Sequence, residues 1–270
     1  MRQSIASLTA QVQITMSIEL ITIPCLSDNY AFLAHDTNSQ QTLLVDVPEV
    51  TPIKRTLADT GWILSDVLLT HHHSDHVQGV EELLCEHPAR VIGANADKHR
   101  LPPLDLAVGE GDKIEIGTQK GQVFDVSGHT IGHIAVLFEE AKLLFTADSL
   151  MALGCGRLFE GSPGQMWESL SKLTTLDPDC LVCSGHEYTA TNARFALTIE
   201  PQNPALQNRA QQISDMCHKN QPTVPSTLRD ELETNPFLRP HSADIRDNLS
   251  MHNASDAQVF AEIRSRKDKF

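Results

Sequence analysis

The chain has 270 residues, of which 40% are hydrophobic and 21% charged. This composition is that of a globular protein and excludes collagenous, disordered and disulfide-scaffold classes. The 35 acidic and 21 basic side chains give a formal charge of −14, which opposes binding to nucleic acid or to anionic lipid. No apolar run approaches the ~20 residues that span a bilayer, so we expect a cytoplasmic protein with neither a membrane nor a nucleic-acid partner.

Two further features concern the ends and the redox state of the chain. Residues 1–15 are weakly patterned and are predicted to be a flexible tail, with Met16 as an alternative start. The six cysteines are scattered through a chain large enough to fold without disulfides, so we expect free thiols. Cys180 and Cys183 fall within an apolar strand and are predicted to be core residues.

Short β-rich segments dominate the first half of the chain. Strands are predicted at residues 19–25, 30–35, 42–47, 67–70 and 90–94, and then at 113–116, 122–127, 134–138 and 142–146. Helical patterns fall between them at 51–59 and 77–85, the second with apolar residues at helical spacing. This alternation predicts an α/β sheet sandwich.

The pattern changes beyond Tyr188. Residues 189–200, 204–220, 226–234 and 255–269 are all helix-like. Pro204 suits the first turn of a helix, and Ser226 is predicted to cap the next one. We therefore place a domain boundary near residue 188, with an α/β domain at 16–188 and a helical domain at 189–270.

The most informative segment follows an apolar strand and reads Thr70-His71-His72-His73-Ser74-Asp75-His76. Its pattern of His71, His73, Asp75 and His76 would arise by chance in on the order of a few chains per thousand of this composition. A loop after a strand can turn His71 and His73 toward one point and Asp75 and His76 toward a second. Imidazole and carboxylate are ligands of zinc, iron and manganese, so a metal site is expected here.

Three later strands also end in candidate ligands, namely His129, Asp148 and His186. A rigid sheet can fix the geometry of side chains at its strand ends. His72 and His133 are expected to pack or to support the ligands. The remaining histidines have no partners in the pattern and are expected at the surface; they are His35, His87, His99, His218, His241 and His252.

At these residues the chain resembles the metallo-β-lactamase superfamily and, within it, the glyoxalase II (hydroxyacylglutathione hydrolase) family. The resemblance extends from Met16 to Phe270. It implies a metallo-β-lactamase-like αββα sandwich followed by an all-helical glutathione-binding domain. Besides the histidine segment, it rests on Pro24-Cys25-Leu26-Ser27-Asp28-Asn29-Tyr30, Gly128-His129-Thr130-Ile131-Gly132-His133, Phe145-Thr146-Ala147-Asp148 and Gly185-His186-Glu187-Tyr188-Thr189.

The resemblance implies a dinuclear catalytic centre. It assigns His71, His73 and His129 to one metal, Asp75, His76 and His186 to the other, and Asp148 to both as a bridge. Two divalent ions are expected per chain, with zinc first and iron or manganese as alternatives. They would present hydroxide at neutral pH to a thioester and stabilise the oxyanion, and a thiolate would then leave.

The resemblance also implies contacts to the glutathione part of a substrate. The matching positions hold Arg157, Phe159, Tyr188, Asn192, Arg264 and Lys267. Arg157 stands where Lys is common in the family and Phe159 where Tyr is common, so one hydroxyl contact is missing. In so acidic a chain, binding of a small anion requires a local cluster of basic side chains, and residues 264–269 provide one. The alternative is a solvated helix end, where the helix dipole favours cations.

The expected function is hydrolysis of S-D-lactoylglutathione and related 2-hydroxyacyl thioesters, as in methylglyoxal detoxification. The expected state is a monomer, with an oligomer as the alternative. Two alternatives within the superfamily are a persulfide dioxygenase with one iron and a lactonase, which are expected to lack the helical region with Tyr188, Asn192, Arg264 and Lys267. A third is a non-catalytic metal-binding or anion-binding protein. The presence of every expected ligand argues against it.

Overall fold

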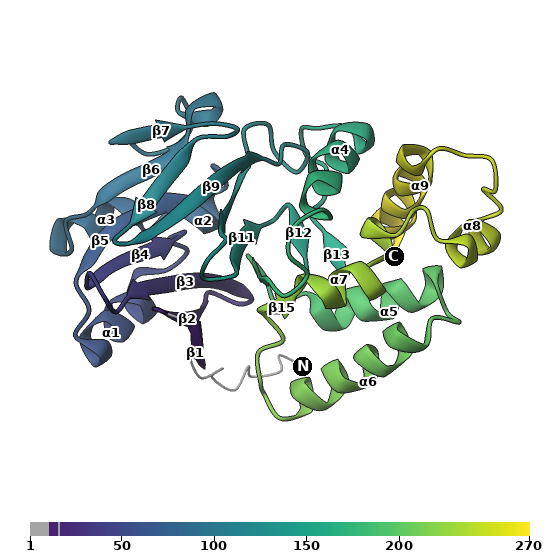
Figure 1. Ribbon diagram of the computed structural model, residues 1–270, viewed down its shortest axis with the longest axis horizontal. Helices are drawn as coiled ribbons and strands as arrows, with labels where there is room; N and C mark the ends of the chain where they lie inside the picture. Colours follow the sequence, from purple (N-terminus) through teal and green to yellow (C-terminus); the bar gives the residue numbers. More distant parts are fainter. Residues whose placement is uncertain (1–10, 16) are drawn as a thin grey trace. The chain divides into compact units, whose positions relative to one another are not determined.

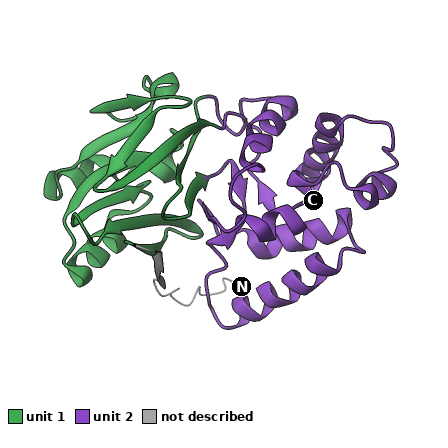
Figure 2. Cartoon of the chain, in the orientation of Figure 1, with its two compact units in different colours: residues 1–125, 132–146 green, residues 126–131, 147–270 purple. Residues whose placement is uncertain are grey.

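The computed structural model describes residues 11–15 and 17–270 of the chain. The chain divides into two compact units (Figure 2). Unit 1 comprises residues 1–125 and 132–146, and unit 2 comprises residues 126–131 and 147–270. Figure 1 shows the helices and strands of the chain with their labels.

A seven-stranded sheet forms the larger part of unit 1. Its strand order follows the sequence from β1 to β7. Neighbours are antiparallel from β1 to β4 and parallel from β4 to β7. The strands are β1 (Gln11–Thr15), β2 (Ile18–Cys25), β3 (Asn29–Asp36), β4 (Gln41–Val45), β5 (Leu64–Leu69), β6 (Arg90–Ala94) and β7 (Leu106–Val108).

Helices cover one face of this sheet. They are α1 (Val50–Thr60), α2 (Ser74–Val77) and α3 (Val80–Glu86), followed by the short 3-10 turn η1 (Asn95–Asp97). Alternate residues of β2 and β3, such as Ile21, Ile23 and Leu33, form a buried cluster with Ile53 of α1 and Leu83 of α3. The period of two in the strands thus places one side-chain set against the helices.

A second antiparallel sheet packs on the other face within unit 1. Its strands pair in the order β11-β10-β9-β8, and the rings of Phe32 and Phe145 meet between the sheets with centroids 5.9 Å apart. Both faces of β3 are therefore buried, as in a sandwich. The strands are β8 (Lys113–Ile116), β9 (Gln119–Asp125), β10 (Ile134–Phe138) and β11 (Leu143–Ala147).

Unit 2 is mostly helical. Leu153, Ala193 and Ala196 pack with Leu206 and Ile213 into a buried cluster that joins α5 to α6. The helices are α4 (Pro163–Leu173), α5 (Thr189–Ile199), α6 (Pro204–His218), α7 (Leu228–Thr234), α8 (Ala243–Leu249) and α9 (Asp256–Lys269), with the 3-10 turn η2 (Pro236–Leu238). Two short antiparallel pairs complete it, β12 (Leu150–Met151) with β13 (Gly154–Cys155) and β14 (Leu181–Ser184) with β15 (Ser226–Thr227).

Several sequence predictions need correction. Part of the predicted tail, residues 11–15, forms β1 and pairs with β2, whereas residues 1–10 and Met16 lie outside the described residues. Thr227, and not Ser226, caps α7, in a reciprocal capping box with Asp230. His35 is buried, with Nδ1 2.9 Å from Thr42 Oγ1 and its ring stacked on Trp62.

The domain boundary near residue 188 stays a prediction. The helices α4 and α8 were not predicted. None of the helices within residues 17–270 is both long and apolar enough to cross a lipid bilayer.

All six cysteines are free thiols, as expected. Cys180 and Cys183 are buried core residues, which confirms that prediction. Burial, with the nearby Glu49 carboxylate, raises the pKa of the Cys25 thiol to about 12. Burial also raises the pKa of Cys155 to about 11, although Arg264 opposes the shift.

Candidate metal centre

The end of β5 delivers the histidine segment. β5 is a buried strand between β4 and β6, and the chain leaves it at Thr70 into an irregular stretch before α2. His71 and His73 lie in that stretch, whereas Asp75 and His76 lie on α2. Buried strands on both sides fix the point from which these four side chains project.

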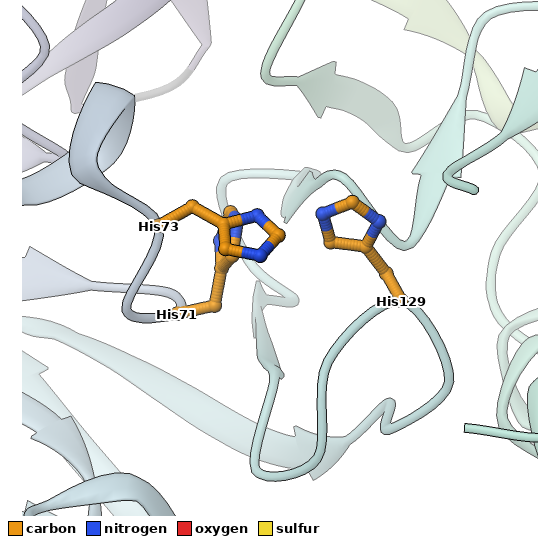
Figure 3. Close-up of side chains that lie close together, drawn as sticks. All are labelled: His71, His73 and His129. Carbon is orange, nitrogen blue, oxygen red and sulfur yellow. The ribbon is translucent and has the colours of Figure 1, made fainter. Parts of the chain in front are cut away.

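His71 and His73 converge on one point. Nε2 of His71 lies 3.2 Å from Nδ1 of His73, and their ring centroids are 4.8 Å apart (Figure 3). Two nitrogens bound tetrahedrally to zinc at 2.0–2.1 Å would be about 3.3 Å apart. The spacing of this pair therefore fits joint ligation of one ion.

Asp46 fixes the imidazoles of His71 and His76. Its carboxylate lies 2.7 Å from Nδ1 of His76 and accepts hydrogen bonds from both the backbone N–H and the hydroxyl of Thr70. Since the Thr70 hydroxyl donates its proton to Asp46, the hydroxyl oxygen of Thr70 accepts a hydrogen bond from Nδ1 of His71, at 3.0 Å. Both rings thus carry their proton on Nδ1, which leaves each Nε2 lone pair for a metal.

Asp46 was not among the predicted functional residues. Asp46 directly follows the apolar run of β4, as Asp148 follows that of β11. This shared pattern could have identified Asp46 as a candidate. Ligand atoms of Asp46, His71 and His76 lie within 4.8 Å of one another, and all three residues are buried. The φ angle of Asp46 is +59°, an unfavourable left-handed conformation of the kind that clusters at functional sites.

Asp75 is held by Asn29 at the start of β3. The Asn29 side-chain amide donates to the Asp75 carboxylate at 3.0 Å and to its backbone carbonyl at 3.1 Å. The same carboxylate lies 3.8 Å from Nε2 of His76. Asp75 and His76 therefore form a second pair of donors in unit 1.

Unit 2 brings the three remaining candidates together around Asp148. One carboxylate oxygen of Asp148 lies 3.4 Å from Nε2 of His129 and 3.3 Å from Nε2 of His186, and all three side chains are buried. The carbonyl of Arg157 accepts from Nδ1 of His129 at 2.7 Å, so Nε2 of this ring also carries the lone pair. A carboxylate between two histidines is the arrangement that a bridging ligand requires.

His72 and His133 take other positions, as expected. Nδ1 of His72 lies 2.9 Å from the buried Asp97 carboxylate. His133 is fully buried, and its ring stacks on that of His71 with centroids 4.6 Å apart. His72 therefore pairs with Asp97, and His133 packs against His71.

The aromatic candidates for substrate contact flank the candidate ligands of unit 2. The Tyr188 ring stacks on His186 with centroids 4.7 Å apart, and Phe159 meets the edge of His129 at 5.4 Å. Both aromatic side chains are exposed, as is Arg157. They can therefore meet a ligand next to His129 and His186.

The other three candidates differ in accessibility. Asn192 is buried and donates to the carbonyl of Ala152 at 3.0 Å. Arg264 is 5% exposed, and it donates to the carbonyl of Cys155 at 2.9 Å and pairs with Asp268. The Lys267 ammonium lies over two aromatic rings, and partial burial together with the nearby Arg264 and Arg194 lowers its pKa to about 8.

Two family models match consecutive parts of the chain. Residues 38–186 match the model of the metallo-beta-lactamase superfamily, and residues 187–270 match the model described as hydroxyacylglutathione hydrolase C-terminus. Proteins named hydroxyacylglutathione hydrolase from Cereibacter sphaeroides, Roseobacter denitrificans and Ruegeria pomeroyi are each 58% identical over 255 residues. These alignments cover 94% of this chain and the full length of each relative.

Solved structures share the fold at low identity. A B3 metallo-beta-lactamase, BLEG-1, has a TM-score of 0.64 at 19% identity and covers 82% of this chain and 99% of its own. ETHE1 from Myxococcus xanthus has a TM-score of 0.59 at 22% identity and covers 96% and 98%. These likenesses confirm the predicted metallo-β-lactamase fold, and the His and Asp donors indicate a divalent-metal centre. With relatives this similar over nearly its whole length, the chain belongs to the hydroxyacylglutathione hydrolase family of the metallo-beta-lactamase superfamily and is a hydrolase.

Proposed function

We propose that the protein hydrolyses S-D-lactoylglutathione and related S-(2-hydroxyacyl)glutathione thioesters to glutathione and the 2-hydroxy acid, as in methylglyoxal detoxification. The observation that carries the proposal is the 58% identity to hydroxyacylglutathione hydrolases over their full length. The chain also retains a His or Asp at each position where the chemistry needs a ligand.

We propose the metal ligands as two sets of three with a bridge. His71, His73 and His129 would hold one ion, Asp75, His76 and His186 the other, and Asp148 both. The convergent nitrogens of His71 and His73 and the proximity of Asp75 to His76 support the pairs in unit 1. The contacts of Asp148 with His129 and His186 support the bridge in unit 2.

The donor chemistry favours borderline divalent metals. Five imidazoles and two carboxylates suit zinc, with iron or manganese as alternatives, and no thiolate takes part. When bound, two such ions lower the pKa of a shared water toward neutrality and offset the charge that develops on a thioester oxygen.

The chain's own residues prepare the ligands for this role. Asp46 and the Arg157 carbonyl keep protons on the Nδ1 atoms that face them, so the Nε2 atoms of His76 and His129 stay available. A thiolate is a good leaving group, because thiols have a pKa near 8.5. The reaction thus needs no dedicated acid from the chain at the sulfur.

We propose that the glutathione portion lies on the exposed side chains of Arg157, Phe159 and Tyr188 and on the half-buried Lys267. The side chains of Asn192 and Arg264 complete this set, and their hydrogen bonds to Ala152 and Cys155 mean that they also hold the backbone beneath it. Cations are suited to this surface because glutathione carries carboxylates.

We also propose a cytoplasmic monomer. Six free cysteines are typical of a reducing compartment. A net charge of −14 keeps copies of the chain apart at low ionic strength.

The test is steady-state hydrolysis of S-D-lactoylglutathione by protein of known metal content, beside a thioester of the same acyl group without the peptide. We expect efficient turnover of the first, poor turnover of the second, and loss of both after chelation. Failure to hydrolyse either thioester with two metals bound would overturn the proposal. Oxygen consumption with glutathione persulfide would then test the dioxygenase alternative.

A further inference from the structure

A buried hairpin lies next to the metal-ligand candidates of unit 2. β12 and β13 pair Leu150 with Cys155 and Met151 with Gly154, and the turn between them contains Leu153 with φ +56°. Every residue from 150 to 156 is buried. Two paired residues per strand satisfy few backbone groups, so the hairpin needs other hydrogen-bond partners.

Side chains from the helical segments supply these partners. Asn235, which precedes η2, is fully buried, and its amide nitrogen lies 3.1 Å from the carbonyl of Met151 and 3.0 Å from that of Gly154. These two carbonyls belong to the residues that flank the turn, so one side chain clamps both strands. Glu231 of α7 accepts from the backbone N–H of Leu153 at 2.8 Å and from Asn235 at 3.0 Å.

The hairpin ends at the metal-ligand candidates. It begins two residues after Asp148, and it leads directly into Arg157, whose carbonyl accepts from Nδ1 of His129. A Cβ atom on Gly156 would lie 2.1 Å from the Asp148 carbonyl and 2.7 Å from Nδ1 of His129, so the backbone here is in close contact with both. A shift of the hairpin therefore moves the acceptor that orients His129.

We propose that Asn235 is a positioning residue for the metal centre. It holds the β12–β13 hairpin, the hairpin sets the Arg157 carbonyl, and that carbonyl fixes the ring orientation and tautomer of His129. This role rests on the proposed function, in which His129 and Asp148 bind metal. It gives the helical C-terminal segment a part in metal binding besides substrate binding.

The substitution Asn235→Asp tests the clamp with little change in shape. The carboxylate keeps the oxygen that accepts from the backbone N–H of Phe237, but it removes the amide donor and faces two carbonyls and Glu231. Removing a partner of a metal-binding histidine typically costs 10–100-fold in metal affinity. We expect a loss of this size, ~10–100-fold, for one of the two metal ions.

The chain offers a matched control in Asn203. This residue is also buried, its amide also donates to a glutamate, Glu200, and to a backbone carbonyl, that of Glu233, and its side-chain oxygen also caps a helix. It makes no hydrogen bond to the hairpin in the part of the chain that the structure describes. Asn203→Asp should lower thermal stability in the same way, with metal affinity unchanged.

The measurement is titration of the metal-free protein with Co²⁺, in competition with a chromophoric chelator, together with the visible spectrum of the bound ions. We expect Asn235→Asp to lower the affinity for one of the two Co²⁺ ions and to change the visible spectrum of that ion. The wild type and Asn203→Asp should bind two Co²⁺ ions with the same affinities and spectra. Wild-type affinity and spectrum in Asn235→Asp would overturn the positioning role, as would an equal change in both variants. If Asn235→Asp does not fold, Asn235→Ala, which removes the donor without adding charge, takes its place under the same criteria.

Kinetics separate this inference from the proposed function. If the wild type binds two Co²⁺ and does not hydrolyse the glutathione thioester, the proposed substrate is wrong while the positioning role still stands or fails on the Co²⁺ titration. If the wild type binds fewer than two ions, the proposed dinuclear centre and the positioning role both fail.

Discussion

The imidazole of His76 is hydrogen-bonded through Nδ1 to the carboxylate of Asp46, at 2.7 Å, across 30 residues of sequence. Both side chains are buried, and the contact directs Nε2 of His76 away from Asp46. The orientation of His76 therefore depends on a carboxylate that follows β4, whereas the histidine segment follows β5.

Replacing Asp46 by Asn should weaken metal binding without removing a ligand. The amide can present its NH₂ group to Nδ1 of His76 and so favour the wrong tautomer. We expect metal affinity to fall ~10–100-fold, measured as metal content after dialysis against a graded series of chelator. Asp36→Asn is the control, because Asp36 is equally buried but binds Ser39 and Thr118. Equal metal loss in both variants would show that only folding was affected.

Asp148→Asn should remove metal and activity together. The proposed bridge loses its negative charge, and we expect a fall in kcat/KM larger than the ~100-fold that loss of an outer partner can cost. Metal analysis and turnover of the same sample measure this. Asp148→Glu keeps the charge and should retain more metal than Asn does. Two tightly bound ions and full turnover in Asp148→Asn would contradict the bridging role.

Lys267 should make substrate binding depend on pH. Because burial and neighbouring cations lower its pKa to about 8, the ammonium loses its proton as the pH rises through 8, and KM should rise over that range. Lys267→Gln should raise KM about 5-fold at pH 7, equivalent to roughly 1 kcal/mol for a solvent-screened ion pair, and leave KM flat from pH 7 to 9.

In the Lys267→Gln variant kcat should stay unchanged, since the contact is remote from the thioester. Lys269→Gln, an exposed lysine on the same helix, is the control. A fall confined to kcat would count against the proposed contact between Lys267 and the glutathione portion of the substrate. Arg264→Ala combined with a Lys267 change is a less clean test, because Arg264 also holds the Cys155 carbonyl.

Phe159→Tyr adds the hydroxyl group that the family resemblance leads us to expect at this position. The Phe159 ring is 62% exposed, so the variant protein should fold normally. If the hydroxyl meets the substrate, a hydrogen bond of 0.5–1.5 kcal/mol should lower KM about 2- to 10-fold with kcat unchanged. An unchanged KM in steady-state assays would show that another group already makes this contact.

The candidate site was largely predictable because its ligands follow strands. Four of the candidate ligands come shortly after an apolar run that forms a strand in the structure. They are His71, His129, Asp148 and His186. Local pattern suffices for such residues, since the strand and its polar end are adjacent in sequence.

The supporting residues could not be predicted in the same way. Asn29 reaches Asp75 across 46 residues, and Asn235 reaches Met151 across 84. Such pairs depend on tertiary packing, which one sequence does not reveal. β12 and β13 were missed for a related reason, as two-residue strands carry no period and are held by side chains from distant helices.

The distribution of thiols has a consequence for a protein that releases a thiol at each turnover. Disulfide exchange requires a thiolate, and a pKa raised to about 12 keeps the Cys25 thiol protonated near neutral pH. Cys155, beside the candidate substrate residues, is buried with a pKa of about 11. Glutathione disulfide should therefore exchange with the exposed Cys85 before the buried Cys25 and Cys155, whereas burial and the nearby Glu187 raise the pKa of Cys217.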